Sequence, residues 1–198
     1  MQGLTPTYKL SSISVVILLL VLTGGGGVAH GRKKKLVSSY DEPCQQMTVY
    51  YHDILYDGTN TANATSAVAA QPTLLSRSVS VNDTYFGEVV VFNDAVTAGR
   101  ALASEPVARA EGFYFYDRKE SLSAWFAFSL VFNSTAHRGT LNLMGPDTIA
   151  AKTRDISVVG GTGDFFMARG IATLRTDTFQ GSYYFRLQMD IKLYECYV

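Results

Sequence analysis

The sequence is poor in the residues from which most metal, redox and nucleic-acid sites are built. Its 198 residues include two cysteines and three histidines, and 17 Lys and Arg residues balance 17 Asp and Glu residues. The His, Cys and carboxylate residues show no clustered metal-ligand spacing, and no flavin motif is present, which argues against an oxidase. Because the chain has no net charge, it lacks the overall electrostatic field that attracts nucleic acid or a charged membrane. We therefore expect no metal, no other cofactor and no nucleic-acid partner.

The chain also lacks a hydrophobic run of membrane-spanning length. The apolar run Ile13–Leu22 is too short to cross a bilayer comfortably. It follows Lys9 and precedes GGGGVAHG, whose small residues suit cleavage, so residues 1–29 are predicted to be a signal peptide. An uncleaved membrane anchor is the alternative. We expect a secreted protein with no membrane contact after cleavage, beginning with a flexible arm at 30–43.

The few cysteines fit this compartment. Cys44 and Cys196 lie near opposite ends of the mature chain, and in an oxidising environment they can close nearly the whole domain into one loop. We predict that they are joined by a disulfide. Three Asn-x-Ser/Thr sequons, at Asn63, Asn82 and Asn133, predict N-glycosylation.

Apolar residues in the remaining domain, residues 44–198, recur with a period of two. In SYYFRLQMDIKLYEC the apolar side chains from Tyr183 to Leu193 alternate with polar ones, which indicates a strand. Similar runs lie at 47–56, 86–94, 110–117, 122–133, 139–144, 154–160 and 165–177. No convincing amphipathic helix separates them, which disfavours a parallel βαβ architecture. Eight antiparallel strands can close into a barrel that holds side chains or one small ligand, and a two-sheet sandwich is the alternative.

The most glycine-rich stretch is RDISVVGGTGDFFMARG. A phosphate-binding loop needs a following helix and usually a Lys-Ser/Thr ending, but a strand-like run without lysine follows here. We predict that Gly160–Gly163 form a tight connection between two strands. In the next strand Ala168, Gly170 and Ala172 place small side chains on the same face as Thr176, which leaves space or admits close packing.

Several long motifs, in order, carry a resemblance to a known family. They are YYHDILYDG, NATSA, FGEVVVFND, ARAEGFYFYD, LVFNSTAHRGTLNLMGPD, TRDISVVGGTGDFFMARGIATLRTD and YFRLQMDIKLYEC. Over almost the whole mature chain the sequence resembles the plant dirigent proteins, most closely the members that form the lignan pinoresinol. The resemblance implies an all-β fold, an eight-stranded antiparallel barrel like those of lipocalins and allene oxide cyclase, assembled as a homotrimer in the plant apoplast or cell wall.

The resemblance also implies a function without an oxidative centre. A separate oxidase or laccase makes coniferyl alcohol radicals, and the protein holds two of them so that they couple 8–8′ to one pinoresinol enantiomer. Two alternatives remain open. One is a cyclase or dehydratase acting on another phenylpropanoid or isoflavonoid intermediate, and the other is a non-catalytic apoplastic protein that binds phenolics.

Carboxyl groups are the candidates for chemistry, because the coupled bis-quinone methide needs a proton donor near each carbonyl oxygen. Asp53 falls in step with Val49 and Tyr51 on one strand face, and desolvation there would raise the pKa of its carboxyl. The family's pocket residues match at Asp53, Asp147 and Arg154. The resemblance implies acid roles for the two aspartates, and Arg154 would place phenolic oxygens or hold Asp147.

Aromatic side chains are the candidates for the pocket wall. Tyr114 and Tyr116 share one strand face and match the family's pocket tyrosines, and Thr176 fits the wall from the small-residue face. Structural roles are the alternatives: core packing for the tyrosines, a turn for Asp147 and a surface ion pair for Arg154. Pro146 stands where related proteins commonly have a small residue.

The number of aromatic residues bears on assembly. The chain has 12 tyrosines and 11 phenylalanines. A domain of this size cannot bury so many inside a barrel that also keeps a cavity. We therefore expect some of them in subunit contacts, consistent with the trimer that the resemblance implies.

Overall fold

The computed structural model describes residues 34–36, 42–70, 85–181 and 183–197, which belong to one compact unit. Ten strands make up its regular structure: β1 (Lys34–Leu36), β2 (Gln45–Ile54), β3 (Ser66–Ala70), β4 (Val89–Thr97), β5 (Pro106–Tyr116), β6 (Ala124–Asn133), β7 (Arg138–Asp147), β8 (Arg154–Gly163), β9 (Arg169–Gln180) and β10 (Tyr184–Tyr197). The predicted signal peptide and Asn82 lie outside the described residues. Within these residues no helix has the length and apolar character needed to cross a membrane.

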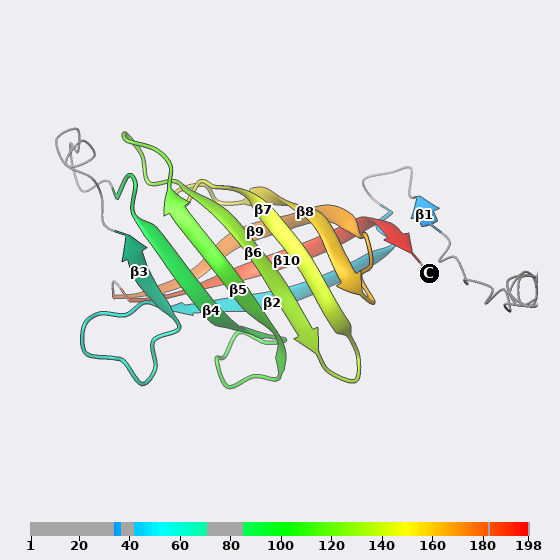
Figure 1. The fold of residues 1–198 in the computed structure, drawn as a ribbon, viewed down its shortest axis with the longest axis horizontal. Helices are drawn as coiled ribbons and strands as arrows, with labels where there is room; N and C mark the ends of the chain where they lie inside the picture. Colours follow the sequence, from blue (N-terminus) through cyan, green and yellow to red (C-terminus); the bar gives the residue numbers. More distant parts are fainter. Residues whose placement is uncertain (1–33, 37–41, 71–84, 182, 198) are drawn as a thin grey trace, which may run out of the picture. The chain divides into compact units, whose positions relative to one another are not determined.

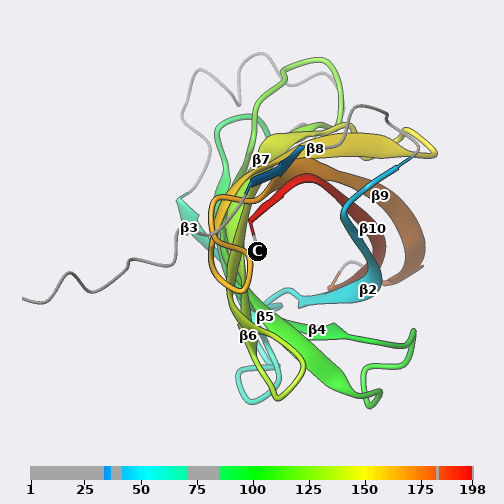
Figure 2. The ribbon, with the colours of Figure 1, turned by 90° about the vertical axis from the view of Figure 1, so that its right-hand side faces the viewer.

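Eight of the strands form a closed antiparallel barrel. The sheet runs from β2 through β4, β5, β6, β7, β8 and β9 to β10, and β10 pairs with both β9 and β2, which closes the ring. Figures 1 and 2 show the strands tilted along the barrel and curving around its interior. The predicted eight-stranded barrel is confirmed, and the sandwich is excluded. The two other strands extend the sheet. β3 pairs with the first half of β4. β1, which lies in the segment 30–43 that was expected to be a flexible arm, pairs with the end of β10.

The alternation of apolar and polar residues in the sequence matches the alternation of buried and more exposed side chains in the structure. In β6 every second residue from Ala124 to Phe132 is buried, whereas the residues between them are partly exposed. β10 repeats the pattern, with Leu187, Met189 and Ile191 fully or almost fully buried. Burying a side chain of this size stabilises the fold by about 1.5–3 kcal/mol relative to exposure, so the inward row of each strand fixes its register.

The glycine-rich stretch does not form the connection predicted for it. Gly160–Gly163 belong to β8 and pair with β7, and the turn follows at residues 164–168. A Cβ on Gly161 would lie 2.3 Å from the carbonyl oxygen of Phe165 and 2.6 Å from that of Thr140. Glycine is needed here because the next turn folds back against the strand itself. The prediction of a strand-to-strand connection at these glycines is therefore wrong.

The alternating strand directions give the barrel two different ends. At one end β2, β5, β7 and β9 finish and β4, β6, β8 and β10 begin. At the other end the buried ring of Phe165 lies 4.7 Å from the ring of Phe132 and 5.3 Å from that of His137, measured between centroids. Aromatic packing therefore fills the second end, whereas the first holds a cavity.

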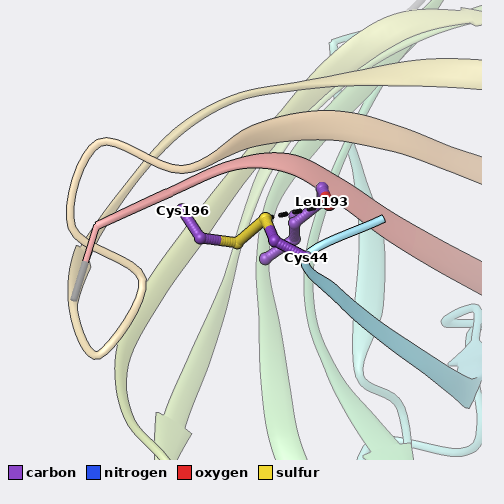
Figure 3. The surroundings of a disulfide bond; sticks show 3 residues. All are labelled: Cys44, Leu193 and Cys196. Atoms are coloured by element: carbon purple, nitrogen blue, oxygen red, sulfur yellow. Dashed lines mark hydrogen bonds between the residues drawn. A yellow bond between two sulfur atoms is a disulfide. The ribbon is translucent and has the colours of Figure 1, made fainter. Parts of the chain in front are cut away.

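The filled end also carries the predicted disulfide. Cys44 and Cys196 are joined, with sulfurs 2.06 Å apart and Cα atoms 6.2 Å apart (Figure 3). The backbone N–H of Cys44 donates to the carbonyl of Leu193 at 2.8 Å, and the Cys44 sulfur lies 3.2 Å from the same oxygen. The bond ties the first barrel strand to the last, which are neighbours in the ring.

Replacing both cysteines with alanine should lower the free energy of unfolding by about 2–5 kcal/mol. The disulfide closes a loop with a sequence separation of 152 residues, so its loss enlarges the unfolded ensemble. Urea denaturation of the wild-type protein and the double variant measures the difference. An unchanged free energy of unfolding would contradict the prediction, as would a free thiol found by alkylation and mass spectrometry in the folded protein.

Candidate functional site

A cavity of about 250 Å³ lies at the end of the barrel where β4, β6, β8 and β10 begin. Each of the eight barrel strands, or the residue next to it, contributes to the wall. The wall consists of aromatic residues (Tyr85, Tyr114, Tyr116, Phe126, Phe179, Tyr184, Phe185), small and aliphatic residues (Leu55, Leu122, Ala124, Ile149, Gly181, Leu187) and a few polar residues (Glu88, Asp147, Arg154, Thr176). Such a lining, apolar with few polar groups, is typical of sites for small organic ligands.

Asp147 and Arg154 form a buried ion pair in this wall. Asp147 ends β7 and Arg154 opens β8, and the two are 2 % and 8 % exposed. Arg154 Nε donates to Asp147 Oδ1 at 2.5 Å and Nη2 donates to Oδ2 at 3.3 Å. The two-point contact fixes both side chains, as such pairs do. The turn role of Asp147 and the surface ion pair of Arg154 are thereby excluded.

The proton affinity of Asp147 is set by two opposing effects. Burial raises the pKa of its carboxyl, and the hydrogen bonds and positive charge of Arg154 offset only part of that rise. Arg154 Nη1 also donates to Thr176 Oγ1 at 2.8 Å, so β9 helps to hold the guanidinium. Asp147 is therefore a rigidly held carboxyl that binds a proton at higher pH than an exposed aspartate.

The two predicted tyrosines lie side by side in the wall. The rings of Tyr114 and Tyr116 are 5.7 Å apart at 87°, and Tyr114 also packs 5.0 Å from Phe126. Burial raises the pKa of both phenols well above the usual value, so their hydroxyls stay protonated and can donate hydrogen bonds. Five sequence-predicted residues, Tyr114, Tyr116, Asp147, Arg154 and Thr176, thus share one cavity.

Asp53 is the predicted residue that the structure sets apart. It faces the barrel interior with Tyr51 and is fully buried, as expected from its position in the strand. It accepts hydrogen bonds from the Ser66 hydroxyl and, at 3.5 Å, from the Tyr51 hydroxyl. Burial raises the pKa of Asp53 to about 6. Asp53 does not line the cavity, whereas Phe185, its register partner on β10, does, so the acid role of Asp53 stays a prediction.

A second carboxyl shares this interior position and was missed in the sequence. Asp94 is fully buried, and neither of its carboxylate oxygens has a partner in hydrogen-bond geometry among the described residues. Burial raises the pKa of Asp94 to about 8, with a further contribution from the negative charge of Asp53. The rule that placed Asp53 inside would have found Asp94, because it is in step with Val90 and Phe92 in VVVFND.

These two carboxyls should make the fold less stable as the pH rises. Both have folded-state pKa values above the unfolded value, so each stabilises the fold only while protonated, and that contribution is lost as pH rises through about 6 for Asp53 and about 8 for Asp94. His52, whose folded-state pKa is lowered to about 4, acts in the opposite direction, but its effect is nearly complete at pH 6.5 because the unfolded histidine loses its proton around that pH. Between pH 6.5 and 8 we expect Asp94 to reduce the free energy of unfolding by about 1–2 kcal/mol.

Urea denaturation at pH 6.5, 7.2 and 8 tests this expectation. Asp94→Asn should flatten the decline, because asparagine carries no proton that must be lost, whereas Asp155→Asn, a change at an exposed carboxyl on β8, should leave it as it is. Equal pH profiles for the wild type and Asp94→Asn would contradict the assignment.

Glu88 is a carboxyl of the cavity wall that the sequence analysis missed. It precedes β4, lines the cavity and is partly buried. Burial raises the pKa of its carboxyl.

Within the described residues no group of three or more His, Cys, Asp and Glu side chains is arranged to hold a metal ion. Of the glycosylation sequons, Asn63 and Asn133 are exposed.

Known proteins resemble this chain in sequence over most of its length. A family model described as Dirigent-like protein matches residues 44–194. Dirigent protein 5 of Arabidopsis thaliana is 53% identical over 164 residues, which cover 83% of this chain and 87% of that protein. A dirigent protein of Sinopodophyllum hexandrum is 51% identical over 155 residues, covering 78% of this chain and 80% of that protein.

Solved structures resemble it in fold. A pterocarpan synthase dirigent protein superposes with a TM-score of 0.68 at 21% identity, covering 83% of this chain and 87% of that one. A second pterocarpan synthase dirigent protein gives a TM-score of 0.67 at 23% identity, covering 78% and 98%. At these identities the likeness concerns the barrel alone. Taken with the match over residues 44–194 and the relatives at about half identity, it leaves one conclusion: the chain belongs to the dirigent protein family.

Proposed function

We propose that this protein guides stereoselective coupling of phenolic radicals, and that its substrates are two coniferyl alcohol radicals made by a separate oxidase or laccase. The radicals couple 8–8′ and the product closes to one enantiomer of pinoresinol. The observation that carries the proposal is the buried Asp147–Arg154 pair, which lines the cavity together with the aromatic side chains. A site that only bound phenolics would not need a buried carboxyl beside an otherwise apolar ligand.

The cavity suits capture of planar phenolic radicals. Flat rings stack or pack edge-on against Tyr114, Tyr116 and Phe126, and the closed wall determines which faces meet. Its volume of about 250 Å³ is just below the roughly 300 Å³ at which ligand pockets usually begin. Because the cavity is small, two substrates bound at once would extend to its opening, where Tyr85 and Phe179 are exposed.

The ion pair suits the step after coupling. In each half of the bis-quinone methide an aliphatic hydroxyl oxygen bonds to the benzylic carbon, the hydroxyl loses its proton, and the electron pair moves through the ring to the carbonyl oxygen, which gains a proton. The reaction is an isomerisation and needs no oxidant. Asp147, with its raised pKa, donates the proton to one carbonyl oxygen, and Arg154 holds the carboxyl in place.

The test is oxidation of coniferyl alcohol with a laccase, with and without the protein. The protein alone should leave coniferyl alcohol unconsumed. With laccase present, the rate of consumption should stay the same while 8–8′ product replaces the other dimers. Consumption without oxidant, or an unchanged distribution of dimers, would contradict the proposal.

A second candidate is a cyclase or dehydratase that acts on another phenylpropanoid or isoflavonoid intermediate. It is supported by the same acid–guanidinium pair in an apolar cavity, and by the barrel shared with two pterocarpan synthase dirigent proteins. An isoflavonoid-type alcohol incubated with the protein in the absence of any oxidant separates the two candidates, because only the cyclase converts it.

We propose that the protein acts as a secreted homotrimer in the apoplast. The disulfide and the exposed sequons Asn63 and Asn133 support export. An apolar row on the outer face of the barrel supports assembly: Val91 on β4, Phe113 on β5, Ala127 on β6 and Met144 on β7 are register partners across four strands. Val91, Phe113 and Met144 are 46%, 42% and 42% exposed. An exposed row of this kind is typical of a subunit contact.

Phe113→Lys should convert the assembly to a monomer, because a charge would be buried in the centre of the contact. Gln46→Lys, on the outer face of β2, is the matched control and should leave the mass unchanged. Light scattering at micromolar concentration measures both. A monomeric wild type, or an unaltered mass for Phe113→Lys, would contradict the assignment of this face.

A further inference from the structure

The cavity carries a second carboxyl opposite Asp147, and its position follows from the strand register. The backbone N–H of Tyr116 donates to the carbonyl of Glu88 at 3.1 Å, which sets these two residues side by side. Tyr116 is the register partner of Ala124, and Ala124 is that of Asp147. Glu88, Tyr116, Ala124 and Asp147 therefore form one row that runs from the residue before β4 across β5, β6 and β7. All four line the cavity.

This row places the two carboxyls on opposite sides of the site. Neighbouring strands are about 4.8 Å apart, so three spacings separate the backbones of Glu88 and Asp147 by about 14 Å along the curved sheet. Tyr116 and Ala124 lie between them in the row, and the small side chain of Ala124 occupies little of the cavity. The bis-quinone methide also has its two carbonyl oxygens at opposite ends, one on each ring.

We infer that Glu88 is the proton donor for the second ring closure, at the end of the cavity opposite Asp147. This inference rests on the proposed function. Glu88 gives its proton to the carbonyl oxygen of the second quinone methide as the aliphatic hydroxyl oxygen bonds to the benzylic carbon and releases its own proton to water. The resulting carboxylate is partly exposed and recovers a proton from solvent.

The surroundings of Glu88 fit this role better than those of Asp53. Glu88 lines the cavity next to the phenol of Tyr116, whose hydroxyl stays protonated and can help to orient a ring oxygen. Asp53 does not line the cavity and already accepts hydrogen bonds from Ser66 and Tyr51. Burial raises the pKa of Glu88, which keeps a larger share of it protonated than an exposed glutamate.

Glu88→Gln tests the inference, because glutamine keeps the shape of the side chain but is not an acid. General acid catalysis contributes about 10²–10⁴-fold, so water should capture the second quinone methide, and the dimer with one closed ring and one added water should rise about tenfold or more. Chirality at the two coupled carbons should stay that of the wild type. Liquid chromatography with mass detection on a chiral phase measures both.

Glu111→Gln, the same change at an exposed position on the outer face of β5, is the control and should match the wild type. If Glu88→Gln gives the wild-type product distribution while the wild type yields one enantiomer, the role of Glu88 is refuted and the proposed function stands. If the wild type itself gives racemic dimers, the proposed function fails first. An increase in water-trapped dimer in Glu88→Gln but not in Glu111→Gln supports the inference.

Discussion

Asp147→Asn should slow the first ring closure by about 10²–10⁴-fold, the usual contribution of general acid catalysis. Asparagine keeps the size of the carboxyl and one hydrogen-bond acceptor for Arg154, so the cavity should still bind both radicals. The proton for the quinone methide then has to come from water, and water addition competes with closure. The decay of quinone methide absorbance after coupling measures the rate, and chromatography measures the water-trapped dimer.

Asp155→Asn is the control for this change, because Asp155 is exposed on β8 next to Arg154 in the sequence. It should behave as the wild type. The oligomeric mass and urea midpoint of Asp147→Asn show whether the variant is folded. A folded Asp147→Asn that closes rings at the wild-type rate and yield would contradict the acid role. Stereocontrol would then depend on the shape of the aromatic pocket alone.

Arg154→Met should lower the free energy of unfolding by about 3–5 kcal/mol at pH 7, because it leaves the buried Asp147 carboxylate without its partner. Yield and enantiomeric excess should both fall, since Asp147 and Thr176 lose the group that holds them. The double variant Asp147→Leu/Arg154→Met removes both charges. It should regain most of the stability but none of the ring-closing activity.

Urea denaturation of the wild type, Asp147→Leu, Arg154→Met and the double variant completes a double-mutant cycle. If Arg154→Met is as stable as the wild type at pH 7, the pair is not a buried ionic contact. If the double variant closes rings as fast as the wild type, the pair has no role in the chemistry.

The eight barrel strands could be predicted because each contains a stretch in which buried residues alternate with more exposed ones, most clearly from Ala124 to Phe132 in β6. The short strands β1 and β3 could not. β3, SAVAA, has no polar and apolar alternation of its own, and it pairs with the part of β4 that lies beyond the pairing of β2 with β4, which ends at His52. Composition predicts a connection at Gly160–Gly163, whereas these residues belong to β8, where Gly161 and Gly163 allow neighbouring backbone to approach closely.

Part of the site could also be predicted from the period of two along each strand. Periodicity tells which face of a strand is inward, and it placed Asp53 and Tyr114 correctly inside the barrel. It does not tell how far along the barrel a residue lies or which larger side chains fill the space around it. For that reason Asp53 was expected at the cavity, whereas the register brings Glu88 there instead. The pairing of Asp147 with Arg154 was one of the two roles expected for the arginine, and the structure shows it because the ends of β7 and β8 meet.

The enantiomeric excess of pinoresinol, measured as a function of the ratio of protein to laccase at constant radical flux, tests the central claim most directly. We predict that one enantiomer rises from the racemic value and saturates as the protein comes to exceed the radicals, with no change in the rate of coniferyl alcohol consumption. Racemic pinoresinol at every ratio, from a folded protein with the mass of a trimer, would contradict it.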